Sequence, residues 1–251
     1  MSSIRTPAQG VCNILRFNWP FFALALAILL GLILGALLTS GALRWFLGAA
    51  IFAAVLPVAI SLFVSWWVYD HSNLYRLDWL DNIPQLKLGR VLNIHAGFDE
   101  TSALLAPRVD ALIVFDFYDS SVHTEASIRR ARRAYPAYAG TKTVKTRALP
   151  LADLSVDAAF VIFSAHEIRD DAERAAFFNE LARVLKPGGT IVVTEHLRDI
   201  YNALAYSAGV FHFLPRRAWQ KTFESAGLRV RTTFQITPFV TTFVLQPDEA
   251  P

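Results

Sequence analysis

The sequence predicts an α/β domain with a mostly parallel sheet and an antiparallel C-terminal hairpin strand, preceded by a two-span transmembrane helical hairpin. The 251 residues are 54% hydrophobic and only 18% charged, against about 45–50% and about 25% in an average soluble domain. The apolar excess lies in the first 70 residues. Beyond them, short apolar runs alternate with helical stretches, which is typical of βα units around a parallel sheet.

Two uncharged runs near the N-terminus are each long enough to cross a bilayer. They extend from Trp19 to Leu38 and from Trp45 to Val68, and a hydrocarbon core of about 30 Å needs about 20 apolar residues in a helix. We therefore predict spans over about 19–39 and 45–68, within a segment 1–69, joined by the short connection 39–44. A signal peptide is the alternative for the first run, but its apolar core would be only about 7–15 residues long.

The basic residues near these runs predict the orientation of the chain. They lie mainly on the outer flanks of the two spans, and only Arg44 lies between them. The positive-inside rule then places both ends in the cytoplasm. We expect a multi-pass protein of the cell inner (cytoplasmic) membrane with its catalytic domain facing the cytoplasm. The net charge of +3 is mild, so we expect no nucleic-acid partner, and the sequence makes no prediction about oligomeric state.

The rest of the chain divides into a juxtamembrane linker, 70–89, expected along the membrane surface, and a catalytic domain, 90–251. Leu228–Gln235 and Phe239–Gln246 are separated by only three residues. That is too few for a parallel crossover, so these two strands must pair antiparallel. The other predicted strands are Arg90–Ile94, Ala111–Phe115, Ala158–Phe163 and Thr190–Thr194, and the predicted helices are Thr101–Ala106, Thr124–Ala134, Asp171–Leu185 and Arg216–Ala226.

Ligands of open α/β sheets bind beyond the carboxyl ends of the strands. The loop after the first predicted strand contains Gly97, and Asp116 ends the second strand about twenty residues downstream. A carboxylate at that distance is placed to accept hydrogen bonds from a ribose. The sequence therefore predicts a nucleoside site at this edge of the sheet.

Two longer segments, RVLKPGGTIVVTE and LPLADLSVDAAFVIFSAHEIRD, together with these loops resemble class I S-adenosylmethionine-dependent methyltransferases of the type 11 kind. The resemblance covers about Arg90 to Gln246. It implies a Rossmann-like sheet, S-adenosylmethionine as the cofactor, and cofactor contacts from the first two loops. On this resemblance the cofactor-binding residues are Asn93, His95, Ala96, Gly97, Asp116, Phe117 and Ser164.

The first loop departs from the family pattern, which is an acidic residue followed by Gly-x-Gly-x-Gly. Asn93 stands at the acidic position, His95 and Asp99 replace the outer glycines, and only Gly97 remains. A histidine there crowds the methionine end, because glycines let the backbone approach a cofactor closely. The departure supports an alternative, a non-catalytic membrane scaffold or assembly subunit of the same fold. A nicotinamide-dependent reductase is disfavoured, because Gly-x-Gly-x-x-Gly is absent.

Methyl transfer mainly requires alignment of donor and acceptor, and a base only when the acceptor is a hydroxyl or an acidic carbon. His166, Glu195 and His196 follow the fourth and fifth strands and are predicted as catalytic residues. Each of these residues could instead have a purely structural role: His196 as a hydrogen-bonded residue of the pocket wall, and Glu167 as the cap of the following helix. The two His–Glu pairs also resemble a metal ligand set, but the spacing fixes no geometry, and we predict no metal.

The segment Leu197–Leu214 is apolar and longer than an ordinary αβ loop of about 2–6 residues. We predict that it covers a lipophilic substrate, the alternative being an ordinary amphipathic helix packed on the sheet. A basic cluster follows the second strand and is suited to anionic lipid or to a solvated helix face. The predicted substrate-binding residues are Glu167, Tyr201, Tyr206, Phe211 and His212, and the basic cluster is Arg129, Arg130, Arg132 and Arg133.

These observations predict a membrane-anchored methyltransferase. It would transfer a methyl group from S-adenosylmethionine to a hydrophobic small molecule such as a lipid, quinone or pigment precursor. The prediction depends on room for a nucleoside beside His95 and on an Asp116 carboxylate that faces the sugar.

Overall fold

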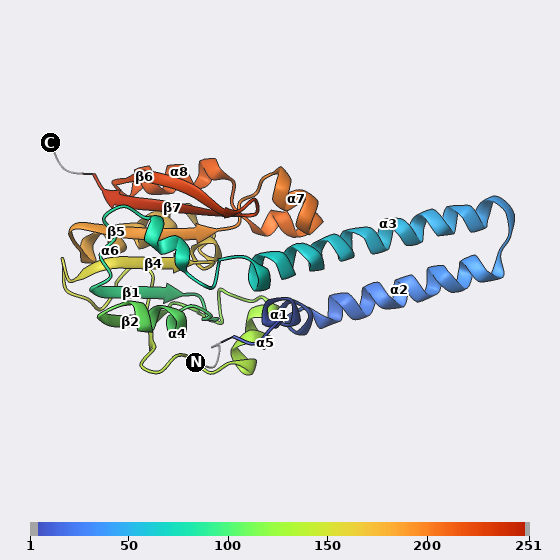
Figure 1. Cartoon of the computed structure of the whole chain (residues 1–251), viewed down its shortest axis with the longest axis horizontal. Helices are drawn as coiled ribbons and strands as arrows, with labels where there is room; N and C mark the ends of the chain where they lie inside the picture. Colours follow the sequence, from blue (N-terminus) through green and yellow to red (C-terminus); the bar gives the residue numbers. More distant parts are fainter. Residues whose placement is uncertain (1–4, 249–251) are drawn as a thin grey trace.

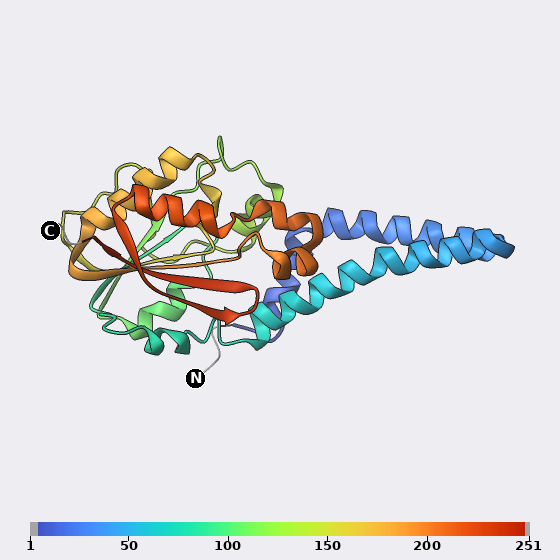
Figure 2. The same cartoon turned by 90° about the horizontal axis from the view of Figure 1, so that it is seen from above.

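A computed structural model describes residues 5–248 of the chain. A rod of two long antiparallel helices projects from a globular α/β domain (Figure 1). The rod consists of α2 (Trp19–Leu38) and α3 (Gly41–Trp66), and α3 continues into a π-helical turn, η1 (Trp67–His71). Seen from above, the rod leaves the domain from one end of the sheet (Figure 2).

Both rod helices are long and apolar enough to cross a membrane, and 0% and 6% of their most apolar windows are buried. Exposure of this extent excludes a buried core helix for either of them. The first predicted span is confirmed as a helix. The connection is shorter than the expected 39–44, because α3 begins at Gly41, whose φ of +66° is accessible without strain to glycine.

A short helix that sequence reasoning missed, α1 (Gln9–Phe17), precedes the rod. Its first turn is held by Asp70 from the end of the second long helix, whose carboxylate oxygens accept hydrogen bonds from the amides of Gly10 (2.6 Å) and Val11 (2.9 Å). A carboxylate at a helix N-terminus satisfies unpaired amides and complements the helix dipole. The contact ties the two ends of the rod to each other.

The domain has a seven-stranded sheet of order β3-β2-β1-β4-β5-β7-β6. The pairs from β3 through β5 are parallel, and β7 lies antiparallel to both β5 and β6. This confirms the predicted fold class, including the antiparallel hairpin; the two-residue β3 was not predicted. The strands are β1 (Arg90–His95), β2 (Ala111–Asp116), β3 (Lys142–Thr143), β4 (Val156–Ile162), β5 (Leu185–Glu195), β6 (Leu228–Thr237) and β7 (Val240–Pro247).

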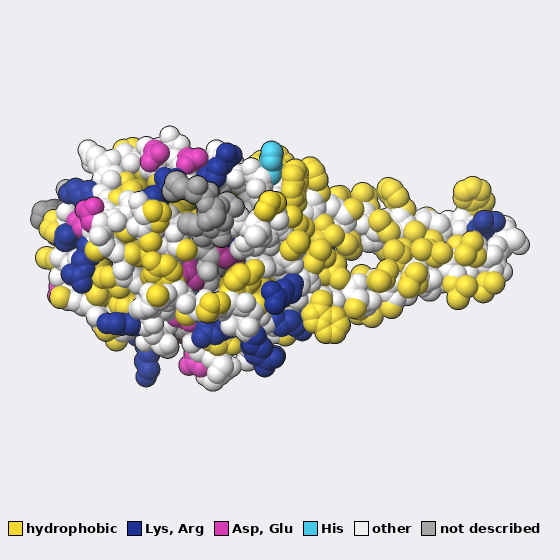
Figure 3. Space-filling model, turned by 60° about the horizontal axis from the view of Figure 1, so that its bottom comes forward, with side chains coloured by type: hydrophobic (Ala, Val, Ile, Leu, Met, Phe, Trp, Pro, Cys, Tyr) yellow, Lys and Arg dark blue, Asp and Glu magenta, His cyan; other side chains and the backbone are white. Residues whose placement is uncertain are grey.

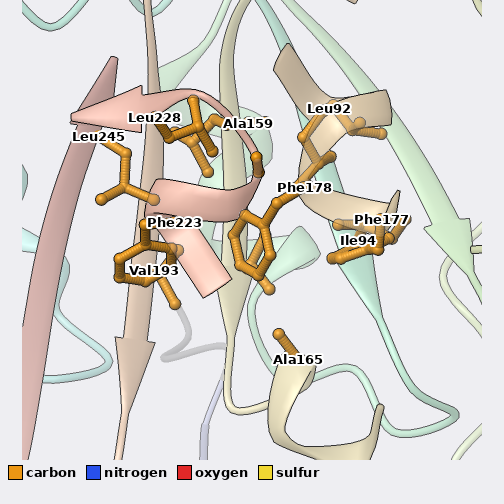
Figure 4. Packing of buried hydrophobic residues seen from close by; sticks show 14 of the residues in the cluster. Leu92, Ile94, Ala159, Ala165, Phe177, Phe178, Val193, Phe223, Leu228 and Leu245 are labelled. Carbon is orange, nitrogen blue, oxygen red and sulfur yellow. The ribbon is translucent and has the colours of Figure 1, made fainter. Parts of the chain in front are cut away.

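Helices cover both faces of the sheet. On one face, α6 (Asp171–Val184) and α8 (Arg216–Ser225) pack aromatic side chains such as Phe178 and Phe223 against β1, β4, β5 and β7 (Figure 4). The remaining helices are α4 (Ser102–Leu105), η3 (Ala106–Arg108), α5 (Ala126–Ala134), η4 (Ala165–Glu167), α7 (Ile200–Tyr206) and η5 (Ser207–His212).

The opposite face of the sheet is covered partly by the segment expected along the membrane surface. Leu77, Trp79 and Leu80 are at most 5% exposed and pack in one cluster with residues of β1, β4 and β5. Trp79 and Leu80 lie in a 3₁₀ turn, η2 (Asp78–Asn82). The expectation is therefore wrong for these residues, because burying their apolar surface against the sheet stabilises the fold.

The rod is joined to the domain at the carboxyl ends of the central strands. Val64 and Val68 from the rod form a buried cluster with Ala205 of α7 and Val240 of β7. The partly buried ring of Phe163, which directly follows β4, packs against the same cluster. The end of the sheet where an α/β fold binds its ligands therefore faces the rod.

Candidate functional site

The first half of the candidate site lies at the ends of β1 and β2. His95 and Asp116 are register partners, and His95 Nδ1 lies 3.7 Å from Asp116 Oδ1. The amide of Gly97 donates to His95 Nδ1 (3.2 Å). Burial lowers the pKa of His95, against the opposing charges of Asp99 and Asp116. Because Nδ1 accepts from the Gly97 amide, the proton of the neutral ring lies on Nε2.

Two polar atoms of this loop are buried without a hydrogen-bond partner in the part of the chain that the structure describes. They are His95 Nε2 and Asp99 Oδ2, which lie 3.9 Å apart. Each such orphan costs about 1–3 kcal/mol. A hydroxyl group between them would accept from the imidazole and donate to the carboxylate.

The Asp116 carboxylate points inward, and the residue is 3% exposed. Its Oδ1 accepts from the amide of Tyr118 (2.9 Å), and its Oδ2 accepts from Arg132 of α5. The Arg132 guanidinium also donates to Gly97 O (3.2 Å) and lies 4.4 Å from the centre of the Tyr118 ring. Arg132 therefore competes for the oxygen that a ribose hydroxyl would need.

The other predicted cofactor residues have structural contacts. Asn93 donates to the hydroxyls of Thr101 (2.9 Å) and Ser102 (2.8 Å), which attaches β1 to the start of α4. Ser164 donates to Ile94 O (3.0 Å) and joins the ends of β1 and β4. The side chains of Ala96 and Phe117 belong to the core. Cofactor contacts by these four residues stay predictions.

Helix α1 lies against the same loop. Phe17 makes edge-to-face contacts with Phe98 (5.4 Å between ring centres) and Tyr135 (6.2 Å), and Phe17 O accepts from Arg130 (2.5 Å). Arg5 forms an ion pair with Glu100 (2.6 Å). The segment that leads into the first long helix is thereby attached to the candidate cofactor loop.

The second half of the site lies at the ends of β4 and β5. His166 Nδ1 lies 2.6 Å from Glu195 Oε2, and His166 Nε2 lies 3.3 Å from Glu167 Oε1. Burial disfavours the charged ring, but the charge of Glu195 and hydrogen bonds to both glutamates outweigh it and raise the pKa of His166 to about 10. Burial also opposes ionisation of Glu167, but hydrogen bonds from His166 and His212 hold its pKa well below the ordinary value. Glu167 does not cap the next helix, because Asp170 does.

His196 has the surroundings of a wall residue. Its ring is stacked between Phe163 and Phe213 (4.9 Å to each ring centre). Its nitrogens contact Tyr69 Oη (2.8 Å) and Phe239 O (2.8 Å). Burial lowers its pKa to about 4. These partners occupy both nitrogens of the ring, which favours the wall role. A catalytic role for His196 stays a prediction.

The predicted substrate cover divides into three environments. Tyr201 and Phe211 are 54% and 70% exposed. Tyr206 packs edge-to-face against His196 (5.4 Å). His212 turns toward the sheet, where its Nε2 lies 3.3 Å from Glu167 Oε1. The segment is therefore one apolar helix followed by a turn that reaches the His–Glu cluster.

Sequence reasoning missed several residues of the site. Arg132 was assigned to a basic cluster suited to anionic lipid or to a solvated helix face, and no spacing rule connects it with Asp116. Glu125, whose Oε1 lies 3.0 Å from His212 Nδ1, and Tyr69, which belongs to the rod, come from distant segments. A cavity of about 530 Å³ beside the rod, lined in part by Tyr69, His71 and Tyr75, had no sequence signal either.

Comparison with known proteins gives the class. The family described as "Methyltransferase domain" matches residues 92–193. The chain is 34% identical over 124 residues to demethylmenaquinone methyltransferase of Beutenbergia cavernae, covering 49% of this chain and 48% of that protein. It is 29% identical over 158 residues to a biotin biosynthesis bifunctional protein of Cellvibrio japonicus, covering 60% and 30%. The chain thus spans half or less of the length of these curated relatives.

Solved structures agree on the fold. A putative type 11 methyltransferase from Sulfolobus solfataricus superposes with a TM-score of 0.52 at 17% identity, covering 70% of this chain and 93% of that one. A SAM-dependent methyltransferase from Methanosarcina mazei gives 0.51 at 16%, covering 68% and 97%. Residues 92–193 therefore match a methyltransferase domain. The fold of the globular part of the chain is that of the class I S-adenosylmethionine-dependent methyltransferases.

The residues at the first loop offer hydrogen-bonding groups suited to this cofactor. The orphaned pair of His95 Nε2 and Asp99 Oδ2 matches a hydroxyl, and the buried Asp116 carboxylate is suited to a ribose. Arg132 is the competitor, and its side chain is 37% exposed, so it can exchange its carboxylate partner for water. The histidine that stands in the place of a glycine supplies a donor here.

Proposed function

We propose that the chain is a membrane-anchored methyltransferase that moves a methyl group from S-adenosylmethionine to a lipophilic small molecule. The observation that supports this most is the attachment of the rod at the carboxyl ends of β4 and β5. Both halves of the site lie at that end. An enzyme anchored in this way meets a bilayer-dissolved acceptor at a raised effective concentration.

S-adenosylmethionine supplies an electrophilic methyl group when bound. In this proposal Asp116 accepts hydrogen bonds from the ribose, while His95 and Asp99 hold a further hydroxyl of the cofactor. Gly97 has a φ of +92°, which lets the backbone of the loop turn tightly beneath it. These groups fix the donor so that the acceptor needs only to be aligned with it.

The His–Glu cluster of the second half would orient the polar end of the acceptor. His166 is a cation at neutral pH in this structure, because its pKa is raised to about 10. His166 already donates to Glu195 and Glu167, so the remaining lone pairs of these two carboxylates would accept hydrogen bonds from a hydroxyl or N–H group of the acceptor. The carboxylate of Glu167 or Glu195 would accept a proton from the acceptor.

The surface around this end supports a lipophilic acceptor. Ile200, Tyr201, Leu204 and Phe211 are all more than half exposed and adjoin the apolar rod. Grouped exposed apolar residues mark interaction surfaces. The Beutenbergia relative is by name a demethylmenaquinone methyltransferase, and a quinone is the kind of acceptor that such a surface suits.

Basic residues lie at the end of the domain that meets the rod, as expected for a domain that contacts a membrane surface there. Arg130 and Arg132 make internal contacts, whereas Arg129 and Arg133 are exposed on α5. Dark blue side chains gather where the domain meets the rod (Figure 3). Basic residues there would contact anionic lipid, and by the positive-inside rule a domain in the cytoplasm would suit this charge.

The test is methyl transfer into lipid. Membranes of cells that produce the full chain are incubated with methyl-labelled S-adenosylmethionine, and label is counted in the organic extract. We expect label above that of cells without the protein and its loss in Asp116→Ala. Asp110→Ala is the matched control, because Asp110 is exposed just before the opposite end of β2. Label that persists in Asp116→Ala would refute the assigned site.

One observation favours a second function, a non-catalytic scaffold: Arg132 occupies the acceptor oxygen of Asp116. Calorimetry with S-adenosylhomocysteine separates the two functions. A scaffold gives no saturable heat, whereas the proposed enzyme gives a one-to-one isotherm.

A further inference from the structure

We propose that His166, Glu167 and His212 form a binding site for a divalent transition-metal ion, with Zn²⁺ as the ion that best suits the ligands. One ligand atom from each residue lies within 4.8 Å of the other two. This metal site is distinct from the proposed methyl transfer, and binding of the ion by these three residues does not depend on that activity.

The distances match coordination. The Nε2 atoms of His166 and His212 both lie 3.3 Å from the same atom, Glu167 Oε1. Ligand atoms held at about 2.0–2.1 Å by a tetrahedral ion are themselves about 3.3–3.4 Å apart. Two of the three edges of the ligand triangle therefore already have the required length. Two histidines and one glutamate are a known zinc ligand set that leaves a fourth position open.

Both histidines have a carboxylate behind the ring. Glu195 Oε2 lies 2.6 Å from His166 Nδ1, and Glu125 Oε1 lies 3.0 Å from His212 Nδ1. A carboxylate on Nδ1 orients the ring so that Nε2 faces the metal, which is the usual outer shell of a metal-binding histidine. The two carboxylates come from different segments, the end of β5 and the residue before α5, so neither pairing results from sequence proximity.

Charge and access agree with a cation. Binding of the ion would displace the proton of His166 and the contact of Arg169, whose Nη2 lies 2.6 Å from His212 Nδ1 and 3.4 Å from His212 Nε2. With both histidines then neutral, Glu125, Glu167 and Glu195 face this one cation. A divalent ion neutralises the remaining charge of two. The side chains of the three ligands are 10%, 16% and 28% exposed, so an ion can enter and its open position can face an acceptor oxygen.

The proposed set differs from the one considered from sequence. His196 lies between aromatic rings with both nitrogens bonded, and His212 takes its place. The prediction that no metal is bound is replaced by this proposal. Because His212 belongs to η5 and the other two ligands to η4, the ion would fasten the substrate cover to the sheet.

The test is Zn²⁺ binding by the metal-stripped full chain in detergent, without a polyhistidine tag, by competition with a chromophoric chelator. We expect one Zn²⁺ per chain, and Co²⁺ should give the visible absorption of a low-symmetry site. His212→Asn should weaken binding at least as much as Glu125→Gln, for which loss of an outer-shell carboxylate predicts about 10–100-fold. His71→Gln is the control, because His71 is exposed and packs on Trp66 in the rod.

Two results would overturn the proposal. Wild-type protein that does not compete with the chelator would show that the cluster is an ion-pair network. Unchanged affinity in both His212→Asn and Glu167→Gln would show that Zn²⁺ binds elsewhere. Thermal unfolding with and without Zn²⁺ verifies that each variant folds, and S-adenosylhomocysteine binding, measured separately, distinguishes failure of the metal site from failure of the proposed enzyme.

Discussion

Replacement of Arg132 by methionine is predicted to tighten cofactor binding. In the structure Arg132 donates to Asp116 Oδ2 and to Gly97 O. Both acceptors belong to the loops that we assign to S-adenosylmethionine. Methionine keeps an apolar stem over the Tyr118 ring but offers no donor. The Asp116 carboxylate then becomes available without first breaking an ion pair.

The size of the effect follows from the exposure of the pair. Hydrogen bonds to charged groups contribute about 1.5–3 kcal/mol, whereas exposed ion pairs contribute about 0.2–1 kcal/mol. Asp116 is 4% exposed and Arg132 37% exposed at the side chain, so about 1–2 kcal/mol is appropriate. At 1.4 kcal/mol for each factor of ten, Kd falls by about 5–30-fold.

Calorimetric titration of the full chain with S-adenosylhomocysteine measures this Kd. Arg133→Met is the matched control, because Arg133 is the exposed neighbour of Arg132 on α5; its Kd should equal that of the wild type. Weaker binding in Arg132→Met would contradict the reasoning and assign Arg132 to cofactor recognition instead.

Two further predictions concern stability. Gly97→Ala should destabilise the domain more than Gly140→Ala. Both glycines have positive φ, but of these two only Gly97 lies where a new Cβ would meet a ring, that of Tyr118 at 2.9 Å. Equal shifts in the denaturant midpoint of the two variants would refute the steric argument. The stability of the wild type should fall on acidification from pH 7 to pH 5, because the unfolded chain protonates His196 near 6.5 and the folded chain only near 4. The contribution of neutral His196 to stability is therefore complete above pH 6.5 and is lost as the pH falls toward 4. The loss attributable to His196 is about 2 kcal/mol at pH 5 and should disappear in His196→Gln; an unchanged pH slope in that variant would contradict it.

The sheet was predictable because its signals are local. Each buried strand is a short apolar run, and the three residues between β6 and β7 allow only an antiparallel pair. Helix α1 was missed because it is short and lacks a capping side chain on its N-cap residue, Ala8. Its cap, Asp70, lies 60 residues away in the sequence, at the end of the second rod helix, and sequence proximity cannot indicate such a contact.

The site was predictable only in part, for the same physical reason. Strand ends placed His95, Asp116, His166 and Glu195 correctly at one edge, because parallel strands bring their carboxyl ends together. Which of these side chains pair was not predictable. The partners Arg132 and His212 come from a helix and a turn whose positions depend on tertiary packing.

The central claim is that the methyltransferase site opens toward the bilayer, and spin-label accessibility tests it most directly. In a Cys12→Ser background, nitroxides are placed at Phe211 on the substrate cover and at Leu154, just before β4 at the opposite end of the sheet; both residues are exposed, 70% and 57%. In nanodiscs we predict that oxygen, which concentrates in the bilayer, relaxes the Phe211 label more strongly, and that a water-soluble nickel chelate relaxes the Leu154 label more strongly. Equal accessibility at the two positions would contradict the account.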